Sequence, residues 1–370
     1  MLLVFTVILV ALIFTFTNGF HDTANAIATV VGTKVLTPRQ AILLATVTNL
    51  LGALSGAAVA QTIASGLVDT TGRFIPPAAS SEMLVCALLA AIAWNLITWY
   101  FGMPSSSSHA LVGGLCGAAL AAAQGNWHAV IWSKMPAAGQ HWWAGGGVLF
   151  KVVIPMILSP LLGFLIAFFL MALLYLSLQN WRPQTVTRTF GRLQLCSSAY
   201  MGFSHGTNDA QKTMGIIALA LVAATKAGAF DSLPSWLAFL KTPEPAAGRS
   251  LTIAPWIKVL CALTMAAGTA VGGWRIIKTL GHKLVKLQPV HGFAAETASA
   301  SVLLGTALFG MPVSTTHVIT TSIMGVGAAR RWSAMKWILV EQIVWAWILT
   351  LPLSAGVAFS LVKLAEMIRS

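Results

Sequence analysis

The stretch FSHGTNDAQKTMG, residues 203–215, interrupts a chain that is otherwise mostly hydrocarbon. A second polar stretch, NGFHDTANAIAT at residues 18–29, lies near the N-terminus. An aspartate in the middle of a membrane-length apolar segment is costly to bury, so it is retained chiefly where it binds an ion or a substrate. The two stretches therefore mark the candidate functional centre, and we work outward from them.

The composition predicts an all-α polytopic membrane protein. Of the 370 residues, 57% are hydrophobic and 8% charged, whereas soluble domains carry about 25% charged residues. The polar stretches between apolar runs are each shorter than the roughly 40 residues that usually fold alone. The net charge of +13 is spread over short loops without a clustered basic face, which excludes a nucleic-acid partner. The four cysteines lie singly in apolar runs, so no structural metal is expected.

Ten apolar segments are long enough, or nearly so, to cross a bilayer, which takes about 20 residues. They are 2–32, 40–60, 82–100, 107–123, 148–178, 190–224, 254–274, 292–309, 315–329 and 337–362. The first and sixth exceed one straight crossing and carry glycine-containing polar inserts, so we expect broken helices there. The loops after the first, fifth, seventh and ninth segments hold twelve Lys and Arg, against five in the loops between them. By the positive-inside rule, both termini of this cytoplasmic-membrane protein face outward.

The chain contains an internal repeat. FGMPSSSSH at residues 101–109 and FGMPVSTTH at residues 309–317 share six identities in nine. GFHDTANA at 19–26 likewise corresponds to GTNDAQKT at 206–213. Two halves, 1–180 and 181–370, each with about five segments, would cross the membrane in opposite senses. This pattern predicts the inverted repeat of secondary transporters, with 10–12 crossings, half-helices and a substrate site near the midplane.

The FGMPxSxxH motifs are suited to binding an oxyanion. Gly and Pro end the incoming helix, and Pro is tolerated in the first turn of the next. Free backbone N–H groups, the helix dipole and several hydroxyls then converge where an anion would lie. The predicted substrate residues are Ser105, Ser106, Ser107, Ser108, Ser314, Thr315 and Thr316. The alternative is that these small residues cap and pack kinked helices.

The aspartate motifs are suited to a small cation or a proton. Asp22 and Asn25 share one helix face, and Asn208 and Asp209 keep the oxygens in the second copy. Lys212 stands where Asn25 stands in the first copy, so it either neutralises Asp209 or contacts the anion. A structural ion pair is the alternative.

Four histidines and two glutamates complete the candidate site. His21, His109, His205 and His317 are candidates for tuning nearby donors, although a lone histidine in a helix is more often a packing residue. Glu82 and Glu296 begin the helices that precede the two FGMP motifs. Each either coordinates a coupling cation or simply favours a helix N-terminus.

Four ordered motifs, NGFHDTANAIAT, WYFGMPSSSSH, FSHGTNDAQK and GMPVSTTHV, resemble the inorganic phosphate transporter (PiT) family of cation and phosphate symporters over essentially the whole chain. The resemblance implies cation coordination at Asp22, Asn25, Asn208 and Asp209, phosphate contact at the Ser/Thr runs, and a homodimer. The family's usual GANDVANA signature is altered here by His21, Gln211 and Lys212. These departures are similar to the bacterial low-affinity Pit-type branch, which is associated with proton coupling and metal-phosphate uptake. The co-ion, H⁺ or Na⁺, stays open.

The sequence therefore predicts a symporter that imports inorganic phosphate, with no cofactor. Sulfate or another oxyanion is the alternative substrate for the same fold. A membrane enzyme using Ser, His and Asp is the rival class. The duplicated placement of every polar motif argues against it, since one asymmetric active site needs a single positioned nucleophile.

Overall fold

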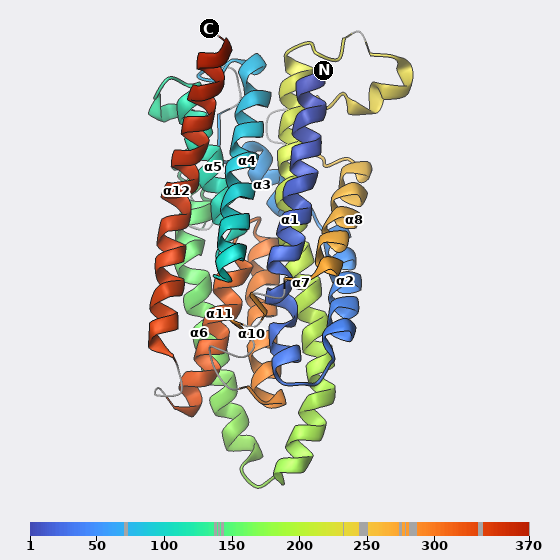
Figure 1. Cartoon of the computed structure of the whole chain (residues 1–370), viewed down its shortest axis with the longest axis vertical. Coiled ribbons are helices and arrows are strands. Elements are labelled where there is room, and N and C mark those ends of the chain that lie inside the picture. Colours follow the sequence, from blue (N-terminus) through green and yellow to red (C-terminus); the bar gives the residue numbers. More distant parts are fainter. Residues whose placement is uncertain are drawn as a thin grey trace.

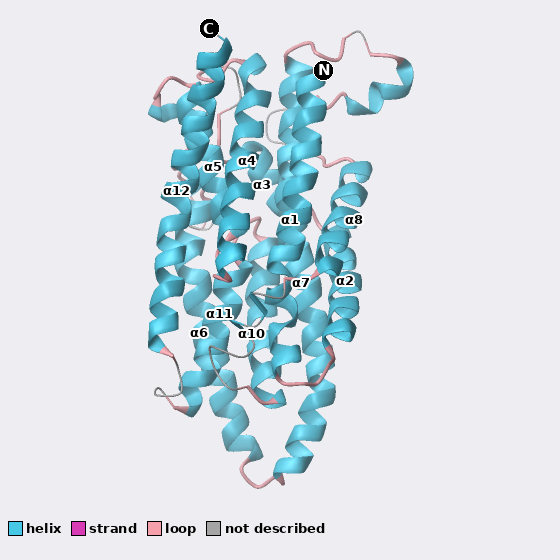
Figure 2. Cartoon of the chain, in the orientation of Figure 1, coloured by secondary structure: helices cyan, strands magenta, loops and turns pink. Residues whose placement is uncertain are grey.

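Helices make up most of the chain that the computed structural model describes (Figure 2). The described residues are 1–69, 73–136, 139, 141, 144–231, 233–243, 251–273, 276–277, 279–280, 287–331 and 336–369. The helices before residue 180 are α1 (Leu2–Gly32), α2 (Pro38–Leu54), α3 (Ala58–Ser65), α4 (Pro77–Phe101), α5 (Ser107–Ala122) and α6 (Ile154–Leu178), the last preceded by the π-helical turn η3 (Leu149–Val153). The later helices are α7 (Pro183–Lys226), α8 (Pro255–Val271), α10 (Pro289–Leu308), α11 (Thr315–Arg330) and α12 (Trp337–Arg369).

Several of these helices are long and apolar enough to cross a bilayer, so the protein is a multi-pass membrane protein. Four qualify singly: Leu2–Gly32, Ala79–Phe101, Leu149–Leu178 and Trp337–Arg369; α2 and α3 together make a fifth, bent by 66°. The helices α6 and α12 expose large apolar side chains, among them Phe169 and Ile348. An apolar outer surface of this kind is stable against lipid tails. The helices α5 and α11 have only 16 residues each, too few for the roughly 20 that a full crossing takes.

The prediction that the first and sixth segments are broken helices is wrong. Both α1 and α7 continue as single helices through their polar stretches, over 31 and 44 residues. The glycines in these stretches serve close packing instead. A Cβ at Gly19 would lie 2.6 Å from the carbonyl oxygen of Met265, and one at Gly206 would lie 2.2 Å from that of Asn49. Neighbouring backbones therefore approach too closely for any side chain, while the helix hydrogen bonds stay intact.

The long helices α1 and α7 form the centre of the bundle (Figure 1). In Figure 1, α1 descends from the N-terminus, whereas α7 rises from the loop at the opposite end of the molecule. α4 and α8 pack on α1, and α2 and α10 pack on α7. The short helix α5 packs against α12, and α11 packs against α6. Both chain termini lie at the same end of the molecule (Figure 1). The basic loop after α8, used in predicting orientation, lies partly outside the described residues.

Candidate functional site

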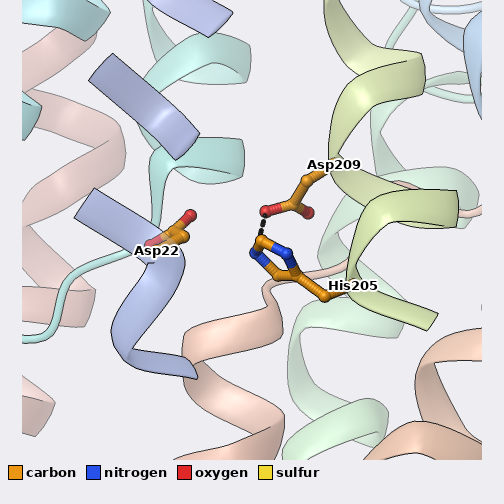
Figure 3. Close-up of side chains that lie close together, drawn as sticks. All are labelled: Asp22, His205 and Asp209. Atoms are coloured by element: carbon orange, nitrogen blue, oxygen red, sulfur yellow. Dashed lines mark ion pairs between the residues drawn. The ribbon is translucent and has the colours of Figure 1, made fainter. Parts of the chain in front are cut away.

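The two motif aspartates meet between α1 and α7. Asp22 and Asp209 are 1% and 0% exposed. Figure 3 shows Asp22 reaching from α1 towards Asp209 and His205 of α7. One ligand atom from each of these three residues lies within 4.8 Å of the others. Two buried carboxylates this close repel each other unless cations, protons or hydrogen-bond donors compensate them.

Asp22 is surrounded by neutral donors and one histidine. His21 Nδ1 lies 2.8 Å from Asp22 Oδ1. The Ser107 hydroxyl donates to Oδ2 at 2.7 Å, and the Thr316 hydroxyl donates to Oδ1 at 3.3 Å. One hydroxyl comes from each copy of the FGMPxSxxH motif, so both predicted anion sites contact this carboxylate.

Asp209 is surrounded by a fixed cation as well as by neutral donors. The Lys212 ammonium, 1% exposed, donates to Asp209 Oδ1. His205 Nε2 lies 3.1 Å from Oδ2, and the Thr315 hydroxyl donates to Oδ2 at 3.3 Å. The Asn208 amide donates to Oδ1 at 3.1 Å. The predicted pairing of Lys212 with Asp209 is therefore present in the structure.

The two hydroxyl runs begin helices in the same manner. The Ser106 side chain caps α5 by accepting from the backbone N–H of His109 at 3.1 Å. The Ser314 side chain caps α11 by accepting from the N–H of His317 at 3.2 Å. As predicted, both runs lie at the N-termini of short helices, where backbone N–H groups and the helix dipole favour an anion.

Each aspartate motif also reaches the helix start of the other copy. The Asn25 amide donates to Thr315 Oγ1 at 3.2 Å and to Thr316 Oγ1 at 2.9 Å. The Lys212 ammonium donates to Ser108 Oγ. Aspartates, amide, ammonium and hydroxyls thus form one continuous buried cluster, which we call the central cluster.

The motif histidines connect the aspartates to side chains that the sequence did not point to. His21 Nε2 lies 3.2 Å from Thr98 Oγ1 on α4. Ser105, predicted to contact substrate, donates to the same Thr98 oxygen at 2.8 Å, so Thr98 and His21 lie between its hydroxyl and Asp22.

On the other side, His205 Nδ1 lies 3.0 Å from Asn49 Oδ1 on α2. The Asn49 amide in turn donates to Thr269 Oγ1 on α8 at 3.1 Å. Thr98, Asn49 and Thr269 are polar residues of mainly apolar helices, and none of them belongs to a duplicated motif. The sequence pointed to them only because a polar group is costly to bury in a membrane segment.

The other two histidines contact each other. The rings of His109 and His317 are edge to face with centroids 4.7 Å apart. His317 also stacks on Trp347 at 3.9 Å, and the Trp347 indole donates to the carbonyl oxygen of Pro104 at 3.1 Å. These ring contacts join α12 to the first turns of α5 and α11. The two histidines therefore fit a packing and positioning role.

The two glutamates lie in different environments. Glu296 is fully buried and accepts from Thr29 Oγ1 and Ser197 Oγ, each at 2.5 Å, and from Gln194 Nε2 at 3.2 Å. Glu82 instead pairs with Arg369, near the C-terminus, at 2.8 Å. The structure therefore gives Glu82 a peripheral ion pair and surrounds Glu296 with neutral donors from α1 and α7.

A buried charged cluster at the start of two short helices, inside a bundle with an apolar outer surface, defines a membrane transporter of a charged solute. The model of the phosphate transporter family matches residues 18–182 and 176–358. The chain belongs to the phosphate transporter family, which consists of transporters and not enzymes.

Similar proteins agree with this assignment. The chain is 41% identical over 356 residues to a probable low-affinity inorganic phosphate transporter of Bacillus subtilis (strain 168), covering 96% of this chain and 95% of that protein. It is 40% identical over 349 residues to a protein of the same description from Rhizobium meliloti (strain 1021), covering 94% and 92%. A solved structure described as the sodium-dependent phosphate transporter superposes with a TM-score of 0.80 at 25% identity and covers 100% of both chains.

Proposed function

We propose that this protein is a secondary active symporter that imports inorganic phosphate together with a coupling cation, H⁺ or Na⁺. The observation that carries the proposal is the central cluster. Two buried aspartates from α1 and α7 are bonded there to hydroxyls at the starts of both short helices. An anion at those helix starts and a cation at those carboxylates would be direct neighbours.

Phosphate would lie against the hydroxyls of Ser105 to Ser108 and of Ser314 to Thr316, with Lys212 as a fixed positive charge. Hydroxyl and backbone N–H donors at a helix N-terminus bind tetrahedral oxyanions. Phosphate, unlike sulfate, has an O–H donor near neutral pH and gains from an acceptor in the site. The carboxylates of Asp22 and Asp209 supply such acceptors within hydrogen-bond distance of the hydroxyl runs.

The coupling cation would neutralise the carboxylates. Two aspartates and one lysine give the central cluster a formal charge of −1 when its histidines are neutral. An entering anion is repelled until a cation or proton binds, so each solute favours the other by the same coupling free energy. Proposed oxygen ligands are Asp22, Asn25, Asn208 and Asp209, and Glu296 with its three donors is a separate place for a cation or proton.

Transport would proceed by alternating access of two inverted halves, 1–180 and 181–370, in the cytoplasmic membrane with both termini outside. The opposite directions of α1 and α7 in Figure 1 support this arrangement. The matched caps Ser106 and Ser314 support it as well. A site shared between two halves can open to either side when one half rocks against the other.

Phosphate uptake into proteoliposomes under separately imposed proton and sodium gradients tests this function. We expect uptake under one of them, and the active gradient identifies the co-ion. The same assay with and without Mg²⁺ shows whether phosphate enters free or as a metal complex. Absence of uptake under every gradient would refute the proposal.

Sulfate is the alternative substrate, because hydroxyl donors alone bind both anions. Unlabelled sulfate added to the uptake assay decides between them. We expect sulfate to compete at least about tenfold more weakly than phosphate, since it cannot donate to the carboxylates. Equal competition would make this a general oxyanion symporter.

A further inference from the structure

Residues 25 and 212 occupy matched places but differ in charge. The two copies of the motif align Asp22 with Asp209, and therefore Asn25 with Lys212. Both side chains are 1% exposed. Asn25 donates to Thr316 at the start of α11, and Lys212 donates to Ser108, which has the same motif position at the start of α5. The ammonium therefore lies where the other half presents a neutral amide.

Among the described residues, the side chains bonded to Asp22 include no lysine or arginine, and two amide oxygens near it in the sequence have no donor. Hydroxyls of Ser107 and Thr316 contact this carboxylate, together with His21. The buried Oδ1 atoms of Asn25 and Asn18 accept no hydrogen bond from the described residues. Asn18 and Asn25 lie four residues before and three residues after Asp22, so all three share one face of α1.

Buried oxygens without donors are costly unless something positive binds them. A carboxylate and two amide oxygens on one helix face are ligands of the hard type that small cations prefer. At Asp209 the corresponding place is filled by Lys212, whose ammonium contacts both the carboxylate and a hydroxyl of the opposite helix start. The Oδ1 atom of Asn208 also accepts no hydrogen bond from the described residues, but the neighbouring Asp209 carboxylate is already paired with the Lys212 ammonium. The first half therefore presents a cation site, and in the second half the side chain of Lys212 supplies the positive charge.

We propose that the Lys212 ammonium permanently replaces one coupling cation. The transporter then takes up one cation at Asp22 and Asn25 with each phosphate and none at Asp209. This inference rests on the proposed symport and narrows its cation ligands to those around Asp22, because Lys212 takes the place of a cation at Asn208 and Asp209. Because the lysine charge is never released into the cell, each phosphate is accompanied by one positive charge fewer than in a site with asparagine in both halves.

The test is Lys212→Asn, which gives the second half the residue of the first. The charge moved per phosphate is measured in proteoliposomes, at one fixed pH, from the membrane potential at which net phosphate flux is zero. We expect the variant to move one more positive charge per phosphate than the wild type. The Hill coefficient for the coupling cation should rise from about 1 to about 2. Lys258→Asn, on α8 outside the central cluster, is the matched control and should behave as the wild type does.

The reciprocal change, Asn25→Lys, would put a second ammonium beside Asp22. Phosphate–phosphate exchange across the membrane should then no longer depend on the coupling cation. This variant keeps the test decisive if Lys212→Asn does not reach the membrane.

An unchanged charge per phosphate in an active Lys212→Asn variant overturns the inference. So does the loss of transport by a folded Lys212→Asn protein at every cation concentration, and so does an undiminished cation requirement in Asn25→Lys. A wild-type protein that carries no phosphate under any gradient would instead refute the proposed function itself.

Discussion

Asp22 and Asp209 lie at matched positions of α1 and α7, and Glu82 and Glu296 lie in the helices that precede the two FGMP motifs. The aspartates meet in one buried cluster. The glutamates do not, since Glu296 is buried among neutral donors while Glu82 pairs with Arg369, whose side chain is 66% exposed. The difference shows that both copies of a duplicated ionisable residue keep the same role where both face the shared centre of the bundle. A copy that faces the periphery is free to become an ordinary ion pair.

The largest effect is expected from neutralising the aspartates. Asp22→Asn and Asp209→Asn should each lower coupled phosphate uptake by more than about 100-fold. Asp22→Asn removes the charge that the coupling cation binds, and Asp209→Asn removes the charge that holds the Lys212 ammonium. A buried charge pair is worth about 3 kcal/mol or more. Uptake per membrane-inserted protein measures this. Asp231→Asn, at an exposed aspartate, is the matched control and should stay within about twofold of the wild type. Normal transport by both cluster variants would show that the central cluster is not the coupling site.

The two aspartate variants should differ in stability. Asp209→Asn leaves the buried Lys212 ammonium without its carboxylate, which costs about 3 kcal/mol. Asp22→Asn should cost about 1 kcal/mol, because hydroxyls of Ser107 and Thr316 can bond to an amide as well. Thermal unfolding in detergent compares them. The double variant Asp209→Asn/Lys212→Met should recover much of the loss. Equal destabilisation by the two single variants would mean that Lys212 does not depend on Asp209.

The matched glycines of α1 and α7 provide a smaller test. Gly206→Ala should destabilise the protein by about 2 kcal/mol and Gly19→Ala by about 1 kcal/mol, because overpacking forces backbones apart. The order follows from the closer approach at Gly206, 2.2 Å against 2.6 Å. Gly305→Ala in α10 is the control, since its Cβ would meet nothing within 4 Å, and alanine there should be neutral or stabilising by up to about 1 kcal/mol. A reversed order would contradict the packing explanation of the unbroken helices.

Most helix positions could be predicted from the sequence. The segments 2–32 and 107–123 correspond to α1 (Leu2–Gly32) and α5 (Ser107–Ala122), because long apolar runs bounded by Pro, Gly and Ser leave few alternatives. Continuity through the polar stretches was predicted wrongly. Whether a glycine breaks a helix or admits a neighbour depends on the neighbour, and Met265 lies 246 residues from Gly19 in the sequence.

The residues of the candidate site were predictable where a motif was duplicated. Asp22, Asp209 and the two hydroxyl runs meet as the repeat suggested. Thr98 and Asn49, which bond to the motif histidines, were not predictable. Each is one of several small polar residues in a mainly apolar helix, where a hydroxyl or amide can equally bond within its own helix. Only the packing of α4 on α1 and of α2 on α7 brings them to the histidines.

The glutamates give the last and smallest test of the comparison. Glu296→Gln should lower the rate of coupled uptake by about tenfold, because the amide keeps one acceptor but loses the charge that a cation or proton would neutralise. Its donors Thr29, Gln194 and Ser197 come from α1 and α7, so the loss should appear mainly in the dependence on the coupling cation. Glu82→Gln is the matched variant and should stay within about twofold, since an exposed ion pair contributes at most about 1 kcal/mol. If both variants lose activity equally, then the two glutamates act as a functional pair, and burial does not separate the coupling glutamate from the peripheral one.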